Sequence, residues 1–209
     1  AGFGIFDDET VRQAARQEIV RRYYKAECDY KMGNCTKETV ERIRLLMNEN
    51  KLSVNDRAVV KPALEKAETA GCAAVALELE DGVFVTGKSN KLMTACASAV
   101  LNAIKTLSRI ADDMLLLSPI VLSPIIGLKK DVLREDKVKL SLGDVLTALS
   151  ICAATNPIAE KAMSMLVRLR DCEAHSSCIL PEADQSVMRK LGIRLTCEPE
   201  YGSKDLYGF

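Results

Sequence analysis

The sequence predicts a mixed α/β protein with a helical segment over residues 1–71 and a three-layer α/β subdomain over residues 72–209. In the first part, apolar residues recur every three or four positions, as on one face of a helix. From residue 72 onward, short apolar runs alternate with turn residues and helix starts. Apolar residues make up 48% and charged residues 28% of the 209 residues, a composition typical of globular proteins and not of disordered ones.

The helical segment is predicted to contain three helices. The first follows the acidic residues 7–9, ends at residues 32–34, and has an apolar stripe formed by Val11, Ala15, Ile19, Tyr23, Ala26 and Tyr30. The second carries the apolar residues Val40, Ile43 and Met47. The third begins after Ser53, with Asp56 as its capping partner, and Pro62 interrupts it.

The face of the first helix opposite its apolar stripe is basic. It carries Arg12, Arg16, Arg21, Arg22 and Lys25. Acidic residues dilute this run, and a nucleic-acid surface would also need exposed aromatic residues or a recognisable reading element. We therefore expect a solvated face.

Residues 82–89 formally match the phosphate-loop pattern G-x-x-x-x-G-K-[ST]. Their four spacer residues, 83–86, are strand formers, whereas a phosphate loop needs a flexible turn. Asp81-Gly82 is better explained as a two-residue hairpin turn, because apolar residues alternate on both sides of it. Gly82 is therefore expected to form a turn and not a nucleotide cradle.

The second half of the match, Gly87-Lys88-Ser89-Asn90, leads into a predicted helix over residues 90–108 that is apolar on nearly every side. Ser89 or Asn90 is expected to cap this helix. A lysine and a hydroxyl beside a helix start can hold a phosphate or carboxylate, so these four residues form a candidate anion site. In the alternative interpretation, Gly87 makes the turn, Ser89 caps the helix and Lys88 is a solvated charge.

The remaining elements follow from helix caps and short apolar runs. A strand is predicted over residues 114–117, and a helix begins at Ser118-Pro119. Two more helices open at Ser141-x-x-Asp144 and at Asn156-Pro157 and end near residue 170. A strand over residues 174–180, a short helix over 184–191 and a strand over 193–197 complete the chain.

This order of elements resembles the cytidine-deaminase-like fold, in which zinc ligands stand at two helix starts. The corresponding positions read Cys96-Ala97-Ser98 and Pro119-Ile-Val-Leu-Ser123. Ser98 replaces the catalytic carboxylate, and Ile120 and Ser123 replace two thiolate ligands. Because a catalytic zinc needs three protein ligands, we predict no metal site. The eight cysteines contain no Cys-x-x-Cys pair, so they are expected to be buried, reduced thiols.

The single histidine, His175, lies in a predicted strand that places Glu173 on the same face. A carboxylate and an imidazole on one face are candidates for acid/base catalysis, with substrate or water between them. The alternative is a structural histidine held by hydrogen bonds. Further candidates for lining the same crevice are Ser118, Asn156 and Ser176.

Charge and hydropathy restrict the partners. The 29 basic and 29 acidic residues cancel, so no overall field attracts nucleic acid. No apolar run is long enough to cross a membrane, and no signal segment opens the chain, which predicts a cytoplasmic protein. The long amphipathic helices favour a homo-oligomer.

Several longer strings resemble one bacterial family. They are Ala1-Gly-Phe-Gly-Ile-Phe-Asp-Asp-Glu9, Gln17-Glu-Ile-Val-Arg-Arg-Tyr-Tyr-Lys25, Ala76-Leu-Glu-Leu79, Thr86-Gly-Lys-Ser89, Ala148-Leu-Ser-Ile-Cys-Ala-Ala-Thr-Asn-Pro157, Cys172-Glu-Ala-His-Ser176 and Leu195-Thr-Cys-Glu-Pro199. Together they resemble the C-terminal half of the family catalogued as domain of unknown function 1846. The resemblance covers essentially the whole chain and implies a cytoplasmic bacterial protein whose N-terminal half is missing here. It implies no catalytic residue.

The sequence thus predicts a fragment that contributes to an anion or nucleotide site, which the N-terminal half of the same protein would complete. In this hypothesis Gly87, Lys88 and Ser89 bind phosphate, and His175 lies near the reacting group. No cofactor is predicted beyond a nucleotide or phosphate ligand. The competing hypothesis is a non-catalytic module that self-associates through its helical segment and through the helix over residues 90–108.

Overall fold

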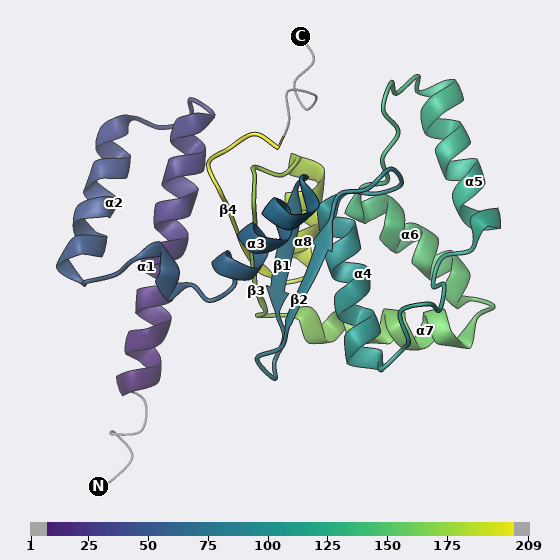
Figure 1. Cartoon of the computed structure of the whole chain (residues 1–209), viewed down its shortest axis with the longest axis horizontal. Coiled ribbons are helices and arrows are strands. Elements are labelled where there is room, and N and C mark those ends of the chain that lie inside the picture. Colours follow the sequence, from purple (N-terminus) through teal and green to yellow (C-terminus); the bar gives the residue numbers. More distant parts are fainter. Residues whose placement is uncertain (1–7, 203–209) are drawn as a thin grey trace, which may run out of the picture.

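The structure is a computed structural model that describes residues 8–202. Two helices lie side by side at one end, a small sheet lies in the centre, and a group of helices lies at the other end (Figure 1). The ends of the two predicted segments, residues 1–7 with Asp7 of the first helix start and residues 203–209, lie outside the described part.

The helical pair consists of α1 (Asp8–Lys31) and α2 (Lys37–Glu49). Their interface belongs to a small core cluster formed by Val20, Tyr24, Met47, Leu52 and Val60. The predicted apolar stripe of α1 is confirmed only in part: Ala26 is buried and Ile19 and Tyr23 pack against this cluster, whereas Val11 is 54% and Tyr30 47% exposed. Other buried residues lie along a neighbouring line through Val20, Tyr24 and Cys28, because α1 packs against both α2 and the last strand of the sheet.

A short helical turn, η1 (Val54–Asp56), follows, and its predicted capping box between Ser53 and Asp56 is confirmed. Helix α3 (Val60–Ala70) comes next and ends at Gly71, whose φ of 63° is left-handed. Pro62 lies in its first turn, where a backbone N–H would have no carbonyl partner within the helix, so a proline is tolerated there. Although α3 precedes the predicted domain boundary at residue 71, it packs on the sheet, and that boundary stays a prediction.

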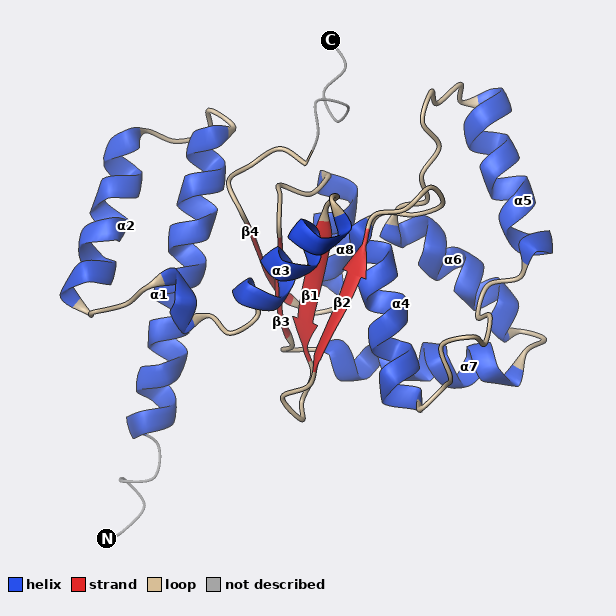
Figure 2. Cartoon of the chain, viewed as in Figure 1, coloured by secondary structure: helices blue, strands red, loops and turns tan. Residues whose placement is uncertain are grey.

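The sheet has four strands in the order β2-β1-β3-β4, shown in red in Figure 2. They are β1 (Ala74–Glu78), β2 (Phe84–Lys88), β3 (Glu173–Ser176) and β4 (Arg194–Cys197). β1 is antiparallel to both β2 and β3, whereas β3 and β4 are parallel. Because α3 packs on one face of β1 and α4 (Ala95–Ser108) on the other, residues 74–77 are fully buried.

The hairpin between β1 and β2 is confirmed, but its turn is one residue longer than predicted. Leu79 N donates to Val83 O at 2.9 Å, which leaves a loop of residues 80–82. Gly82 has a φ of 74° at the third position of this loop. A glycine in that conformation is typical of the three-residue hairpin.

The remaining helices are α5 (Pro119–Gly127), the π-helical turn η2 (Leu128–Val132), α6 (Leu142–Ala153), α7 (Pro157–Ser164), η3 (Met165–Leu169) and α8 (Glu182–Lys190). The predicted capping box of Ser141 and Asp144 and the Asn156 cap are both formed. Within residues 8–202, none of the helices has the length and apolar character that a membrane crossing requires.

The strand predicted over residues 114–117 is absent. Leu116 and Leu117 are both buried although they are consecutive, and Leu115 is 75% exposed. Residues 114–117 pair with no strand of the sheet, so this segment reaches the core as a loop. The structure therefore has one strand fewer than the sequence predicted.

The chain is mixed α/β, as predicted. Its likeness to the cytidine-deaminase-like fold stays a prediction.

Candidate functional site

Gly87 lies within β2, whereas the alternative interpretation of the sequence placed it in a turn. A Cβ atom at this position would be 2.1 Å from Ala99 N and 2.6 Å from Ser98 C. The glycine therefore allows the first turns of α4 to lie directly on the strand. The close approach brings the end of β2 and the start of α4 to one place at the edge of the sheet.

A cavity of about 540 Å³ lies at this edge. We call it the lysine cavity. It is lined by Lys66, Thr86, Gly87, Lys88, Asn90, Leu92, Met93, Ser98, Leu101, Asn102, Lys105, residues 114–117, Pro119 and Leu122. Three lysines and no acidic residue belong to this lining. The side-chain amino groups of Lys66 and Lys88 have no hydrogen bond or ion pair to any residue of the described chain, whereas Lys105 Nζ donates to Asp112 O at 2.8 Å.

Neither Ser89 nor Asn90 caps α4, contrary to the prediction. The helix begins after Thr94, whose hydroxyl accepts from Ala97 N. The Asn90 side chain instead accepts from Leu92 N at 2.8 Å and from Met93 N at 2.9 Å, which fixes the approach to the helix. Asn90 Nδ2 also lies 3.4 Å from Ser98 Oγ in the lysine cavity.

Ser89 lies just outside the lysine cavity. Its hydroxyl accepts from Lys139 Nζ at 2.8 Å, and its backbone N donates to Ala73 O. Of the four residues predicted to bind an anion, three line one cavity, and the fourth holds a further lysine beside it. Lys66, Lys105 and Lys139 were missed because they lie far from Lys88 in the sequence.

The three residues predicted as further pocket lining do not meet in either large cavity. Ser118 lies next to the lining residues Leu117 and Pro119, and its backbone N donates to Cys152 Sγ. Asn156 caps α7 by accepting from Ile158 N at 2.9 Å. Ser176 is fully buried on the sheet face opposite His175.

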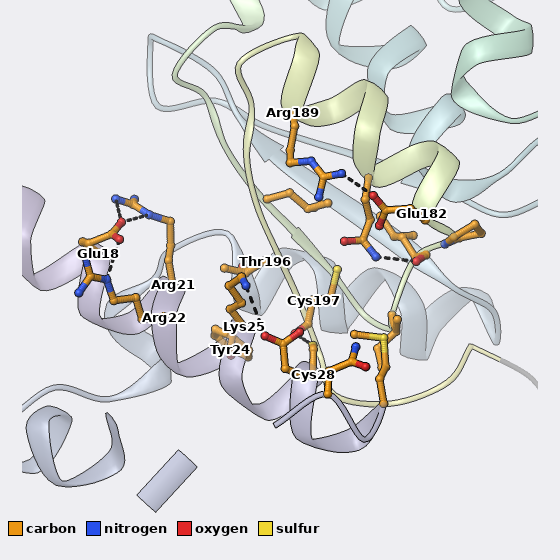
Figure 3. Close-up of a pocket in the computed structure, with 18 residues that line it drawn as sticks. Glu18, Arg21, Arg22, Tyr24, Lys25, Cys28, Glu182, Arg189, Thr196 and Cys197 are labelled. Atoms are coloured by element: carbon orange, nitrogen blue, oxygen red, sulfur yellow. Dashed lines mark hydrogen bonds and ion pairs between the residues drawn. The ribbon is translucent and has the colours of Figure 1, made fainter. Parts of the chain in front are cut away.

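A second cavity, of about 560 Å³, lies between α1, α8 and β4 (Figure 3). Its basic residues are all paired with carboxylates. Arg21 and Arg22 bind Glu18, and Lys25 binds Asp29. Arg189 binds Glu182. A negatively charged ligand would have to displace these partners.

His175 lies beneath this second cavity and is fully buried. Its Nδ1 is 2.8 Å from Thr196 Oγ1, its Nε2 is 3.1 Å from Glu198 Oε1, and the Tyr24 ring centroid is 4.8 Å away. Burial lowers the pKa of His175, which the hydrogen bond to Glu198 partly offsets. A neutral imidazole satisfies these contacts when Nε2–H donates to Glu198 and Nδ1 accepts from Thr196.

Glu173 and His175 do share one strand face, but an arginine lies between them. The Arg57 side chain is 1% exposed and donates to Glu173 Oε2 at 2.5 Å and to Thr196 Oγ1 at 2.8 Å. Arg21 binds the other oxygen of Glu173 at 2.8 Å. Arg21, predicted as part of a solvated face, is thus only 18% exposed. The arrangement favours the structural interpretation of His175, and its catalytic role with Glu173 stays a prediction.

The eight cysteines are free thiols, and six of them are buried, as predicted. Burial raises the pKa of the Cys28 and Cys197 thiols to about 12, and it raises the pKa of Cys96 strongly. Among residues 8–202, no three histidine, cysteine or acidic side chains lie close enough to hold a metal ion.

Two kinds of comparison with known proteins, one with family models and one with individual proteins, both find similar sequences. The model described as "Domain of unknown function DUF1846, C-terminal" matches residues 55–207, and the corresponding N-terminal model matches residues 1–51. A UPF0371 protein of Clostridium botulinum (strain Alaska E43 / Type E3) is 49% identical over 99% of this chain and 43% of its own length. A UPF0371 protein of Clostridioides difficile (strain 630) is 50% identical with the same coverage.

The chain thus spans 43% of the length of these curated relatives. The sequence prediction named this family but assigned the chain to its C-terminal half alone, which leaves out the N-terminal match over residues 1–51. Because the C-terminal family model matches residues 55–207 and the N-terminal family model matches residues 1–51, the chain belongs to the DUF1846 family.

Proposed function

We propose that the protein binds a small phosphate-bearing anion in the lysine cavity. The observation that carries the proposal is the presence of Lys66 and Lys88 in a lining that contains no carboxylate, with neither lysine paired within residues 8–202. Two unpaired cations beside a cavity attract an anion, because the ligand gains their interaction without displacing a protein carboxylate. The second cavity lacks this property, since its four basic residues are already paired.

The polar groups around the two lysines suit a phosphate. Lysine presents a compact point charge, and Asn90 and Ser98 add an amide and a hydroxyl. The nearby start of α4 contributes the partial positive charge of a helix N-terminus. The volume of about 540 Å³ is within the usual range for small-ligand sites.

The site differs from a phosphate loop, although residues 82–89 match that pattern. Residues 84–88 form β2 and pair with β1 in register, so the backbone of the spacer residues belongs to the sheet. Strand backbone in a ladder cannot curl around a phosphate. Lysine side chains from α3, β2 and α4 are proposed to do the binding instead.

Isothermal titration calorimetry with inorganic phosphate, AMP, ATP and GTP tests this proposal. We expect binding that weakens as salt rises, and a loss of about tenfold or more in affinity for Lys88→Ala and for Lys66→Ala. Lys190→Ala, an exposed lysine on α8 outside both cavities, is the matched control and should bind as the unaltered protein does. Absence of heat with every phosphate, or equal affinity after Lys88→Ala, contradicts the proposal.

A second candidate function is self-association, which the sequence also favoured. Helix α4 cannot provide this surface as predicted, because its apolar sides pack on β1, β2 and neighbouring helices. Exposed apolar residues lie on the helical segment, where Leu45 of α2 is 62% exposed, and also on α5, η2 and α6. They include Ile120 at 83%, Val132 at 67% and Ile151 at 51% exposure.

Light scattering across a concentration series tests self-association. If a second copy covers the exposed apolar residues of α5 and η2, Ile120→Glu and Val132→Glu should shift the protein toward the monomer. Val167→Glu, at a 77% exposed apolar position on η3, should not. A monomer at every concentration excludes this candidate.

A further inference from the structure

The lysine cavity has a second character besides its charge. Its lining includes six residues from the segment 114–122, namely Met114, Leu115, Leu116, Leu117, Pro119 and Leu122. Leu92, Met93 and Leu101 add further apolar side chains, and no aromatic residue belongs to the lining. The lysines stand on α3, β2 and α4, whereas most of the apolar wall comes from the loop before α5 and the start of that helix.

Part of this apolar wall is open to solvent. Leu115 is 75% and Met114 is 40% exposed, although both contribute to the lining. The neighbouring Leu116 and Leu117 are 4% and 8% exposed, which anchors the segment to the core. A ligand that covered Met114 and Leu115 would remove apolar surface from water and would bind more tightly for that reason.

The polar side chains of the cavity are poorly placed to read a nucleobase. Asn102 Nδ2 already donates to Thr86 O at 2.9 Å, and Asn90 Oδ1 already accepts two backbone N–H groups. Among residues 8–202, the lining of this cavity holds no aromatic ring on which a base could stack, and stacking and edge hydrogen bonds are the usual means of base recognition. Apart from the Thr86 hydroxyl and Asn102 Oδ1, the groups left for the body of a ligand are aliphatic.

From these observations we infer that the ligand is a phosphate monoester of an aliphatic chain, with the phosphate at Lys66 and Lys88 and the chain against Met114, Leu115 and Leu101. This inference rests on the proposed anion binding and specifies its substrate class. A free alkyl phosphate and a lipid phosphate headgroup share this chemistry. The experiment below separates these two sources.

Calorimetric titration of the whole chain with ethyl, butyl, hexyl and octyl phosphate, each kept below its micelle concentration, measures the contribution of the aliphatic part. We expect affinity to rise by about threefold per methylene group until the wall is covered. AMP should bind no more tightly than ethyl phosphate. Equal affinity from ethyl to octyl phosphate, or tighter binding of AMP than of octyl phosphate, overturns the inference while leaving anion binding intact.

Two kinds of variant separate the aliphatic wall from the lysines. Leu115→Ser and Met114→Ser, at solvent-exposed positions, should reduce the increase in affinity with chain length while leaving ethyl phosphate binding unchanged. Lys88→Gln should weaken every member of the series by the same factor. Val167→Ser is the matched control for loss of an exposed apolar side chain and should change neither quantity. An unchanged chain-length dependence in both serine variants contradicts the inference.

Sedimentation with phosphatidylcholine vesicles that contain phosphatidic acid shows whether the ligand is a membrane lipid or a free phosphate ester. Vesicle binding that Leu115→Ser weakens supports the inference with a membrane lipid as ligand. Binding of octyl phosphate without vesicle binding supports it with a free phosphate ester as ligand. If no phosphate of any kind binds, the proposed function itself fails, and this outcome is distinct from loss of the chain-length dependence.

Discussion

Arg57 and Thr196 are 139 positions apart in the sequence, and the Arg57 guanidinium donates a hydrogen bond to the Thr196 hydroxyl at 2.8 Å. The same side chain also donates to Ala174 O at 2.8 Å and to Arg194 O at 2.6 Å. One buried cation therefore connects the segment before α3 to both β3 and β4. Arg57 also lies between Glu173 and His175: it binds Glu173 directly, and it is linked to His175 through the Thr196 hydroxyl.

Arg57→Met should lower the free energy of unfolding by about 1–3 kcal/mol, since it leaves two backbone carbonyl groups without their buried donor while Arg21 still pairs with Glu173. Denaturation in urea, followed by circular dichroism, measures this change. Arg168→Met is the control, because Arg168 and Glu80 form an exposed pair with 44% and 56% of their side chains accessible. Such a pair contributes about 1 kcal/mol or less. A loss as small as that in Arg57→Met would show that the network is not stabilising.

His175 should make stability depend on pH. Its folded pKa is lowered by burial, so the unfolded chain binds the proton more readily. The groups facing it are Tyr24, Arg57, Thr196 and Glu198. The stability that neutral His175 confers is complete above its unfolded pKa of about 6.5 and is lost as pH falls below that value toward the folded pKa.

Comparison with His175→Gln isolates this contribution, because the carboxylates titrate in both proteins. Urea denaturation at intervals between pH 5 and pH 7.5 should show a steeper decline toward acid pH in the unaltered protein. Parallel curves for the two proteins would mean that His175 does not titrate differently on folding. If His175→Gln fails to fold, NMR titration of the imidazole in the unaltered protein measures the same pKa directly.

Gly87→Ala should destabilise the protein by about 1–3 kcal/mol or more, because the new methyl group would meet the backbone of Ala99 and Ser98. Helix α4 would have to move away from β2. Gly143→Ala is the matched control, since its nearest neighbours would be 3.8 Å from the new Cβ. Alanine in a helix is favoured over glycine by up to about 1 kcal/mol, so this control should be neutral or stabilising. Thermal unfolding of both variants gives the comparison.

Asp184 is fully buried, and its Oδ1 accepts from Leu142 N at 2.7 Å at the start of α6. Its Oδ2 has no hydrogen-bond partner within the described chain. Burial raises the pKa of Asp184, so the protonated carboxyl favours the folded state. That contribution is complete below the unfolded pKa and is lost as pH rises through the folded pKa.

Asp184→Asn keeps the acceptor for Leu142 and removes the buried charge, so at pH 7 we expect stability equal to or above that of the unaltered protein. Asp184→Ala should cost about 1–3 kcal/mol, because it leaves the Leu142 N–H buried without an acceptor. Chemical denaturation at pH 7 distinguishes the two. A larger loss in the asparagine variant than in the alanine variant would show that the charge itself stabilises the two helix starts.

The sequence alone determined the features that depend on neighbouring residues. Caps at Ser53, Ser141 and Asn156, the hairpin around Gly82, and the mixed α/β class all follow from local hydrogen bonds and backbone preferences. The grouping of Glu173 with His175 on one strand face follows from alternation. The sequence could also predict that Gly87, Lys88 and Asn90 contribute to one site, because these residues are consecutive or nearly so.

Only the tertiary structure decided which distant residues meet. Sequence periodicity placed Val11 and Tyr30 in the buried stripe of α1, although both are exposed, because the sequence of one helix does not encode its packing partners. Lys66 joins Lys88 only because α3 packs on β2, and Arg57 separates Glu173 from His175 only because its segment crosses β3 and β4. Contacts between residues far apart along the chain depend on how whole elements pack, and periodicity within one element carries no information about them.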